Sequence, residues 1–160
     1  MMQQMSTRTA MNDRAALDAA YRATCYCVDL PDGARTGVRI RLRLRIGEPS
    51  EVFAEALKAS GVTRWAIIAA VNPGSVALPA EENAARHQAL VDTVTVSGRN
   101  SWPGVNEADS GNWLTEPTLC ILDIGLQDAL RLAAGFGQNA IVAGGADGLP
   151  VLVWISPTHV

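Results

Sequence analysis

The stretch GVRIRLRLRI at residues 37–46 decides the fold. Aliphatic side chains alternate strictly with arginine along most of it, and a repeat of two residues is that of a β-strand with one buried face. An apolar segment at Cys25–Leu30 precedes it and predicts a second strand. The turn residues Pro31-Asp32-Gly33 then begin the connection between the two segments, which predicts an antiparallel hairpin at the start of the domain.

Helical and strand patterns interleave along the rest of the chain. We expect helices over residues 13–23, 50–59, 79–93 and 126–136, and strands over residues 64–71, 118–124, 138–143 and 149–155. The glycine-rich turn at residues 144–148 predicts that the last two strands form a second hairpin. Two hairpins in one core disfavour a doubly wound parallel sheet. The predicted fold class is therefore α/β (α+β mixed), a single mixed β-sheet with helices packed on it.

Two further features complete this predicted fold. The uninterrupted apolar run within residues 64–71 is typical of a central, parallel-type strand that is covered on both faces. Residues 98–117 are polar and show no periodicity, so a long loop is expected there, which is unusual inside a compact domain.

Length and composition indicate one domain in a chain of 160 residues. We expect it to span residues 12–156, with a disordered tail over residues 1–11 and a short tail over residues 157–160. The formal net charge of −3 argues against a dedicated nucleic-acid-binding protein. No apolar run approaches the roughly 20 residues of a membrane span, and the N-terminus lacks a secretory pattern. A cytoplasmic protein without a membrane partner is expected.

The three cysteines, Cys25, Cys27 and Cys120, do not form the even-numbered pattern of a disulfide framework. Buried, reduced thiols are the expected state. A metal site built from these cysteines and His87 is disfavoured, because Cys-x-Cys is not the usual zinc spacing and no histidine pair accompanies it. No metal and no cofactor is therefore expected.

A resemblance to a known family rests on the order and spacing of four sequence motifs. They are WAIIAAVNPGSVALPAEENAARHQAL at residues 65–90, YRAT at 21–24, WLTEP at 113–117 and FGQNAI at 136–141. Together, over roughly residues 18–155, they resemble the uncharacterised bacterial family called domain of unknown function 3293, DUF3293. The resemblance implies a small, single-domain, cytosolic protein and transfers no activity. At residues 69–71 the chain has Ala-Ala-Val where the family pattern leads us to expect a threonine and an aromatic residue.

The best candidate site is the loop Asn72-Pro-Gly-Ser75, which follows the predicted central strand. Ligands of open α/β sheets bind where strands end and helix N-termini converge. Asn72 and Ser75 offer an amide and a hydroxyl there. Asn83 and Arg86 lie three residues apart and share one face of the next helix, from which Arg86 could hold a carboxylate or phosphate. An ordinary turn with local capping is the alternative interpretation of this loop.

Other side chains could join this site. Glu116 is the candidate acid or base if it points into the same cleft. Trp102 and Trp113 in the expected loop either anchor it or face a ligand, and anchoring is preferred. The amides of Gln138 and Asn139 could reach the site from a neighbouring strand end, although a helix terminus at Gly137 explains them as well.

Two classes of function stay open. The first is a domain that binds a small polar or anionic molecule, such as a nucleotide, through Asn72, Ser75, Asn83 and Arg86, with catalysis undecided. The alternative is a non-catalytic nucleic-acid or protein-interaction module that uses the arginines at positions 39, 41, 43 and 45, which project from one strand face. The other interpretation of these four arginines is a solvated sheet face in which they pair with acidic residues. No aromatic residue is interleaved with them to stack on nucleic-acid bases.

Overall fold

The computed structural model describes residues 13–31, 39–111 and 114–156. After a helix over residues 13–22, the elements are β1 (Thr24–Pro31), β2 (Arg39–Leu44), α2 (Glu51–Ala59), β3 (Arg64–Ala69), the 3-10 turn η1 (Pro73–Ser75), α3 (Ala80–Val96), β4 (Ser101–Ala108), β5 (Glu116–Leu122), α4 (Leu126–Gly135), β6 (Ala140–Gly145) and β7 (Val151–Trp154). The predicted mixed α/β class is confirmed. Trp113, the turn residues Asp32-Gly33 and the expected tails over residues 1–11 and 157–160 lie outside the described residues.

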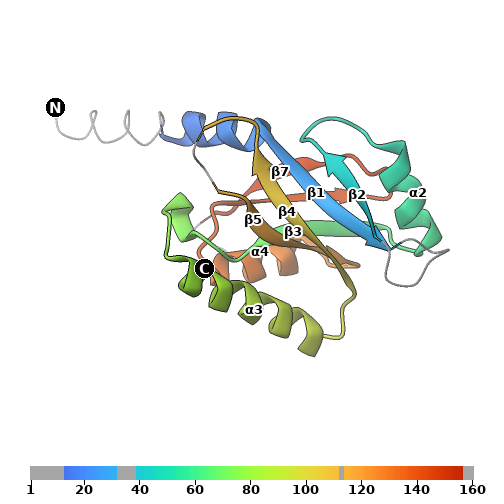
Figure 1. The fold of residues 1–160 in the computed structure, drawn as a ribbon. Coiled ribbons are helices and arrows are strands. Elements are labelled where there is room, and N and C mark those ends of the chain that lie inside the picture. Colours follow the sequence, from blue (N-terminus) through green and yellow to red (C-terminus); the bar gives the residue numbers. More distant parts are fainter. Residues whose placement is uncertain (1–12, 32–38, 112–113, 157–160) are drawn as a thin grey trace.

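One seven-stranded sheet runs through the molecule in the order β2-β1-β4-β5-β3-β6-β7. Every described pairing is antiparallel, including both predicted hairpins, which are confirmed at β1–β2 and β6–β7. Helix α2 covers one face of the sheet, and α3 and α4 cover the other (Figure 1). We call these the α2 face and the α3/α4 face.

Two predictions about the middle of the chain are wrong, and both trace to strand β4. The expected loop at residues 98–117 contains β4, whose Pro103 and Gly104 resemble turn residues in the sequence. Gly104 is needed because a Cβ there would lie 2.0 Å from the carbonyl oxygen of Cys27 on β1. The extra strand also reverses the chain once more before β5. The central strand β3 is therefore antiparallel to both neighbours rather than parallel-type.

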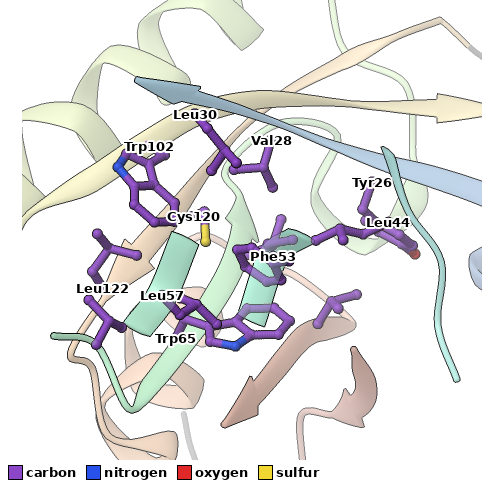
Figure 2. Close-up of a cluster of buried hydrophobic side chains, with 13 residues drawn as sticks. Tyr26, Val28, Leu30, Leu44, Phe53, Leu57, Trp65, Trp102, Cys120 and Leu122 are labelled. Carbon is purple, nitrogen blue, oxygen red and sulfur yellow. The ribbon is translucent and has the colours of Figure 1, made fainter. Parts of the chain in front are cut away.

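The core on the α2 face is a cluster of aromatic and aliphatic side chains. Phe53 and Leu57 of α2 are fully buried against Trp65 and Trp102 (Figure 2). Helix α2 starts where predicted, because the Ser50 hydroxyl accepts a hydrogen bond from the Phe53 amide at 3.2 Å. Trp102 is 7% exposed, which confirms that this tryptophan is an anchor. Helix α2 covers only part of this face.

We expect Gly144→Ala to destabilise the protein by about 2 kcal/mol and to lower its melting temperature by about 4–8 °C. A Cβ at Gly144 would lie 2.5 Å from the Trp65 ring and 2.6 Å from the Leu149 carbonyl oxygen. Gly145→Ala is the matched control, since its Cβ would meet only the Thr63 carbonyl oxygen at an ordinary 3.7 Å. Thermal denaturation measures both, and equal effects would contradict this packing.

Candidate functional site

A cavity of about 450 Å³ lies on the α2 face, in the part that helix α2 leaves open. The helix over residues 13–22 borders it through Leu17, Ala20 and Tyr21, while β3 and β6 contribute aliphatic walls. Tyr21 packs edge-on against Trp154 of β7, with ring centroids 5.6 Å apart, and thereby ties this helix to the sheet. Polar lining residues from other parts of the fold include Asn72, Ser75, Asn106, Glu116 and Gln138.

Asn72 is the hub of the polar network at this cavity. Its backbone is left-handed (φ 48°), a conformation that asparagine tolerates better than most residues. The side-chain oxygen accepts hydrogen bonds from the Leu78 amide at 3.0 Å and from Asn83 Nδ2 at 2.8 Å. The Asn72 Nδ2 atom donates to Glu116 Oε2 at 3.2 Å. One asparagine therefore joins the η1 loop, helix α3 and strand β5.

The η1 loop is held against the C-terminal end of α4. The Gly74 amide donates to the Gly137 carbonyl at 2.8 Å, and Asn139 Nδ2 donates to the Ser75 hydroxyl at 3.0 Å. Ser75 has a positive φ of 62°, which is uncommon for serine and is of the kind that clusters at ligand sites. Sequence reasoning considered Asn139 as a contributor, and the structure brings it onto the loop.

Asn83 and Arg86 share one face of α3, yet neither lines the cavity. Asn83 accepts a hydrogen bond from the Asn72 backbone amide at 3.0 Å and so fixes the loop from behind. Arg86 Nε donates to the Ala70 carbonyl at 2.7 Å, and its Nη2 donates to the Phe136 carbonyl. The guanidinium therefore links the end of β3 to the end of α4. The contact between Arg86 and a ligand stays a prediction.

The charge that faces the cavity is negative. Among the described lining residues, Glu116 is the one with a formal charge, and it stands directly opposite Asn106 across the β4–β5 pair. Burial raises the pKa of Tyr21, and the Glu116 carboxylate adds to that rise. The pKa of Tyr26 is raised in the same way, by burial first and by Tyr21 and Glu116 in addition. Both phenols therefore stay neutral at physiological pH.

Sequence reasoning did not single out Asn106 or Tyr21 for the site. Asn106 fell within the expected loop, and only the strand alternation of β4 places it on the α2 face. Tyr21 fell within the helix expected over residues 13–23. Its position in the YRAT motif was the signal that could have directed attention to it.

The four arginines of the alternative hypothesis lie on the α3/α4 side of the edge strand β2 or directly after its end, and three of them pair with acidic side chains. Arg41 binds Asp29 at 2.8 Å, Arg43 binds Glu107 at 3.0 Å, and Arg45 binds Asp109 at 2.7 Å. Arg39 donates to the Asp29 backbone carbonyl at 3.3 Å. This pairing is what a solvated, charge-balanced sheet face requires.

Two of the thiols lie beneath these arginines. Cys25 Sγ and Cys27 Sγ are 3.8 Å apart and buried, whereas Cys120 lies on the opposite face of the sheet. Burial raises the pKa of Cys27 to about 11, with the neighbouring Cys25 thiol contributing, so that a thiolate is disfavoured. Within the described residues, no group of three or more His, Cys, Asp or Glu side chains is arranged to hold a metal ion.

The Asp29–Arg41 pair predicts a pH dependence of stability. Hydrogen bonds from the Arg41 guanidinium lower the pKa of Asp29 in the folded state. The pair therefore contributes fully above the unfolded pKa near 3.9, and this stability is lost as pH falls through the lowered folded value. Because the pair is exposed to solvent, we expect about 0.5 kcal/mol at pH 7.

Asp29→Asn should remove that contribution and flatten the acid limb of the stability curve. Urea unfolding at several pH values measures it, and Arg41→Gln should give the same change from the other partner. A steep acid limb that Asp29→Asn leaves unaltered would contradict the assignment.

Comparison with known proteins gives one match. Residues 68–141 match the family described as Protein of unknown function (DUF3293), a segment that runs from β3 to β6 and includes Asn72, Ser75, Asn83, Arg86 and Glu116. No curated protein and no solved structure matches the chain. None of the described helices is long and apolar enough to cross a membrane. The resemblance to this family that the sequence motifs predicted is therefore confirmed over residues 68–141.

Proposed function

We propose that the chain binds a small polar molecule in the cavity on the α2 face. The observation that carries this proposal is the convergence of polar side chains from separate elements on one mostly aliphatic cavity of about 450 Å³. Aliphatic walls with a few placed polar groups are the usual composition of small-molecule sites. Asn72 and Ser75 from the η1 loop and Glu116 from β5 are the groups expected to contact the ligand.

Asn83 and Arg86 support the site rather than touch the ligand in this proposal. Asn83 holds the Asn72 backbone, and Arg86 holds the carbonyl that ends β3. An anionic ligand is the less favoured class, because Arg86 was its expected partner and Glu116 faces the cavity instead. If the bound molecule is turned over, Glu116 is the group placed to transfer a proton.

A bacterial, cytoplasmic setting is part of the same proposal. It rests on the family resemblance and on three cysteines that are all free thiols in the fold. We do not propose nucleic-acid or protein binding by the arginine surface, which is formed by the arginines at positions 39, 41, 43 and 45. The guanidinium groups of Arg41, Arg43 and Arg45 are already paired with acidic side chains.

A thermal-shift screen with metabolites and nucleotides tests the proposal. A ligand at about 100 times its Kd stabilises the folded state by about 2.7 kcal/mol, which corresponds to a melting temperature about 5–10 °C higher. Ala69→Leu places a larger side chain in the cavity and should abolish that rise, whereas Ala84→Leu on the exposed side of α3 should retain it. Equal shifts in both variants would place the ligand elsewhere, and no shift with any compound would remove the proposal.

A further inference from the structure

Asn106 carries a buried hydrogen-bonding group that the fold leaves unpaired. This residue lines the cavity from β4, where it lies directly opposite Tyr26 on β1 and Glu116 on β5. Its Oδ1 atom is buried and has no hydrogen-bond partner within the described part of the chain. An unpaired buried amide oxygen costs free energy, and a hydrogen-bond donor from a bound molecule would remove that cost.

The polar side chains on either side of Asn106 are engaged with other groups. The Tyr26 phenol donates a hydrogen bond to the Tyr21 carbonyl at 3.0 Å. Glu116 accepts from Asn72 Nδ2 at 3.2 Å and takes part in at least one further interaction. The amide of Asn106 is therefore the polar group of this cross-strand row that a ligand can complete.

The chemistry of a side-chain amide indicates which ligand group would complete it. An amide holds an acceptor and a donor side by side, and half a turn about the Cβ–Cγ bond of Asn106 exchanges Oδ1 and Nδ2, so that either atom can face the cavity. An adjacent N–H and C=O on a ligand can bond both atoms at once, in the way that asparagine binds a base edge through two hydrogen bonds. An ammonium group or a carboxylate can satisfy only one of them.

A charged head group is disfavoured at this position for a second reason. The walls of the cavity are largely aliphatic and include Ile67, Ala69 and Val142. A charge that moves from water into such a space loses hydration and needs an opposite charge to receive it. Since Glu116 is already bonded to Asn72, an ammonium group would have to compete for it, whereas a carboxylate would be repelled by it. A neutral head group avoids both costs.

Building on the proposed function, we infer that the ligand is a neutral amide with an apolar body, a class that includes carboxamides, lactams and nucleobases. Its N–H and C=O groups pair with the side-chain amide of Asn106. The body of the ligand packs against the aliphatic walls formed by residues such as Leu17, Ile67 and Val142. Asn106 is thereby the residue that selects the head group.

Calorimetric titration with a matched probe series tests this inference. Butyl, cyclohexylethyl and phenylethyl bodies each carry a primary carboxamide, an N,N-dimethylcarboxamide, an amine or a carboxylate. The primary carboxamide should bind about 10-fold more tightly than the other three head groups on the same body. It is the one head group of the series that places an N–H beside a carbonyl without a charge.

A substitution at Asn106 tests the residue that the inference assigns. Asn106→Leu keeps the approximate size of the side chain, removes both polar atoms and should weaken carboxamide binding by about 10-fold or more. Asn100→Leu, at an exposed position just before β4, is the matched control and should leave this binding unchanged. Carboxamide binding that Asn106→Leu leaves unaltered would overturn the role of Asn106.

The outcomes separate this inference from the proposal on which it rests. Equal or tighter binding of the amines, carboxylates or dimethylated amides, still blocked by Ala69→Leu, would overturn the neutral-amide class and leave the cavity as a binding site. If no probe and no metabolite binds in a manner that Ala69→Leu blocks, both are overturned. The head-group comparison uses the unmodified protein, so it decides the ligand class even if Asn106→Leu fails to fold.

Discussion

Asn72→Ala is expected to lower the free energy of unfolding by about 3 kcal/mol, which corresponds to a melting temperature about 6–12 °C lower. The substitution removes three side-chain hydrogen bonds, to Leu78, Asn83 and Glu116. It also places alanine at a φ of 48°, where asparagine is better tolerated. Urea and thermal denaturation of the unliganded protein measure the loss.

A double-mutant cycle with Asn83→Ala shows whether the loss comes from this network. Because Asn83 both donates to the Asn72 side chain and accepts from its backbone amide, the two changes should be strongly non-additive. Asn139→Ala removes fewer hydrogen bonds, the ones to Ser75 and Tyr21, and should cost about 1 kcal/mol. A loss for Asn72→Ala no larger than that of Asn139→Ala would contradict the role of Asn72 as a hub.

Arg86→Ala is expected to cost about 3 kcal/mol in the unliganded protein. Its guanidinium satisfies the carbonyls of Ala70 and Phe136, and Ala70 is fully buried. Arg86→Lys keeps the charge but loses the planar fork, so we expect an intermediate loss. Arg131→Ala, which removes an exposed arginine of α4, should change stability by no more than about 0.5 kcal/mol.

This expectation for Arg86 differs from that for a ligand-binding arginine. A residue that held a bound anion would, when replaced, weaken binding and leave the unliganded protein as stable as before. Chemical denaturation without ligand separates the two roles. Unchanged stability of Arg86→Ala would contradict the backbone-bridging role and return Arg86 to the ligand.

Sequence patterns predicted local structure well where one physical signal acted alone. The arginine–aliphatic alternation at residues 37–46 predicted the hairpin strand, and Ser50 predicted the start of α2. They failed at Pro103 and Gly104, where a crowded strand needs the residues that elsewhere form a turn. Because β4 was missed, the direction of β5 relative to β3 was also missed.

The candidate site shows the same division between local and long-range information. Spacing predicted that Asn83 and Arg86 share a helix face. The position of the Asn72–Ser75 loop, directly after an apolar strand, made it the candidate site. The partners of Arg86 are backbone carbonyls 16 and 50 residues away, and no side-chain pattern marks a carbonyl as an acceptor. Likewise, the β4–β5 register, rather than any motif, places Asn106 opposite Glu116.

The central claim is that the cavity on the α2 face binds a small polar molecule. Backbone amide chemical shifts, recorded by NMR while a compound that raises the melting temperature is titrated in, test it most directly. We predict that the largest changes fall at Asn72, Ser75, Asn106 and Glu116. Changes concentrated instead at Arg39, Arg41, Arg43 and Arg45 would contradict the claim and favour the arginine surface.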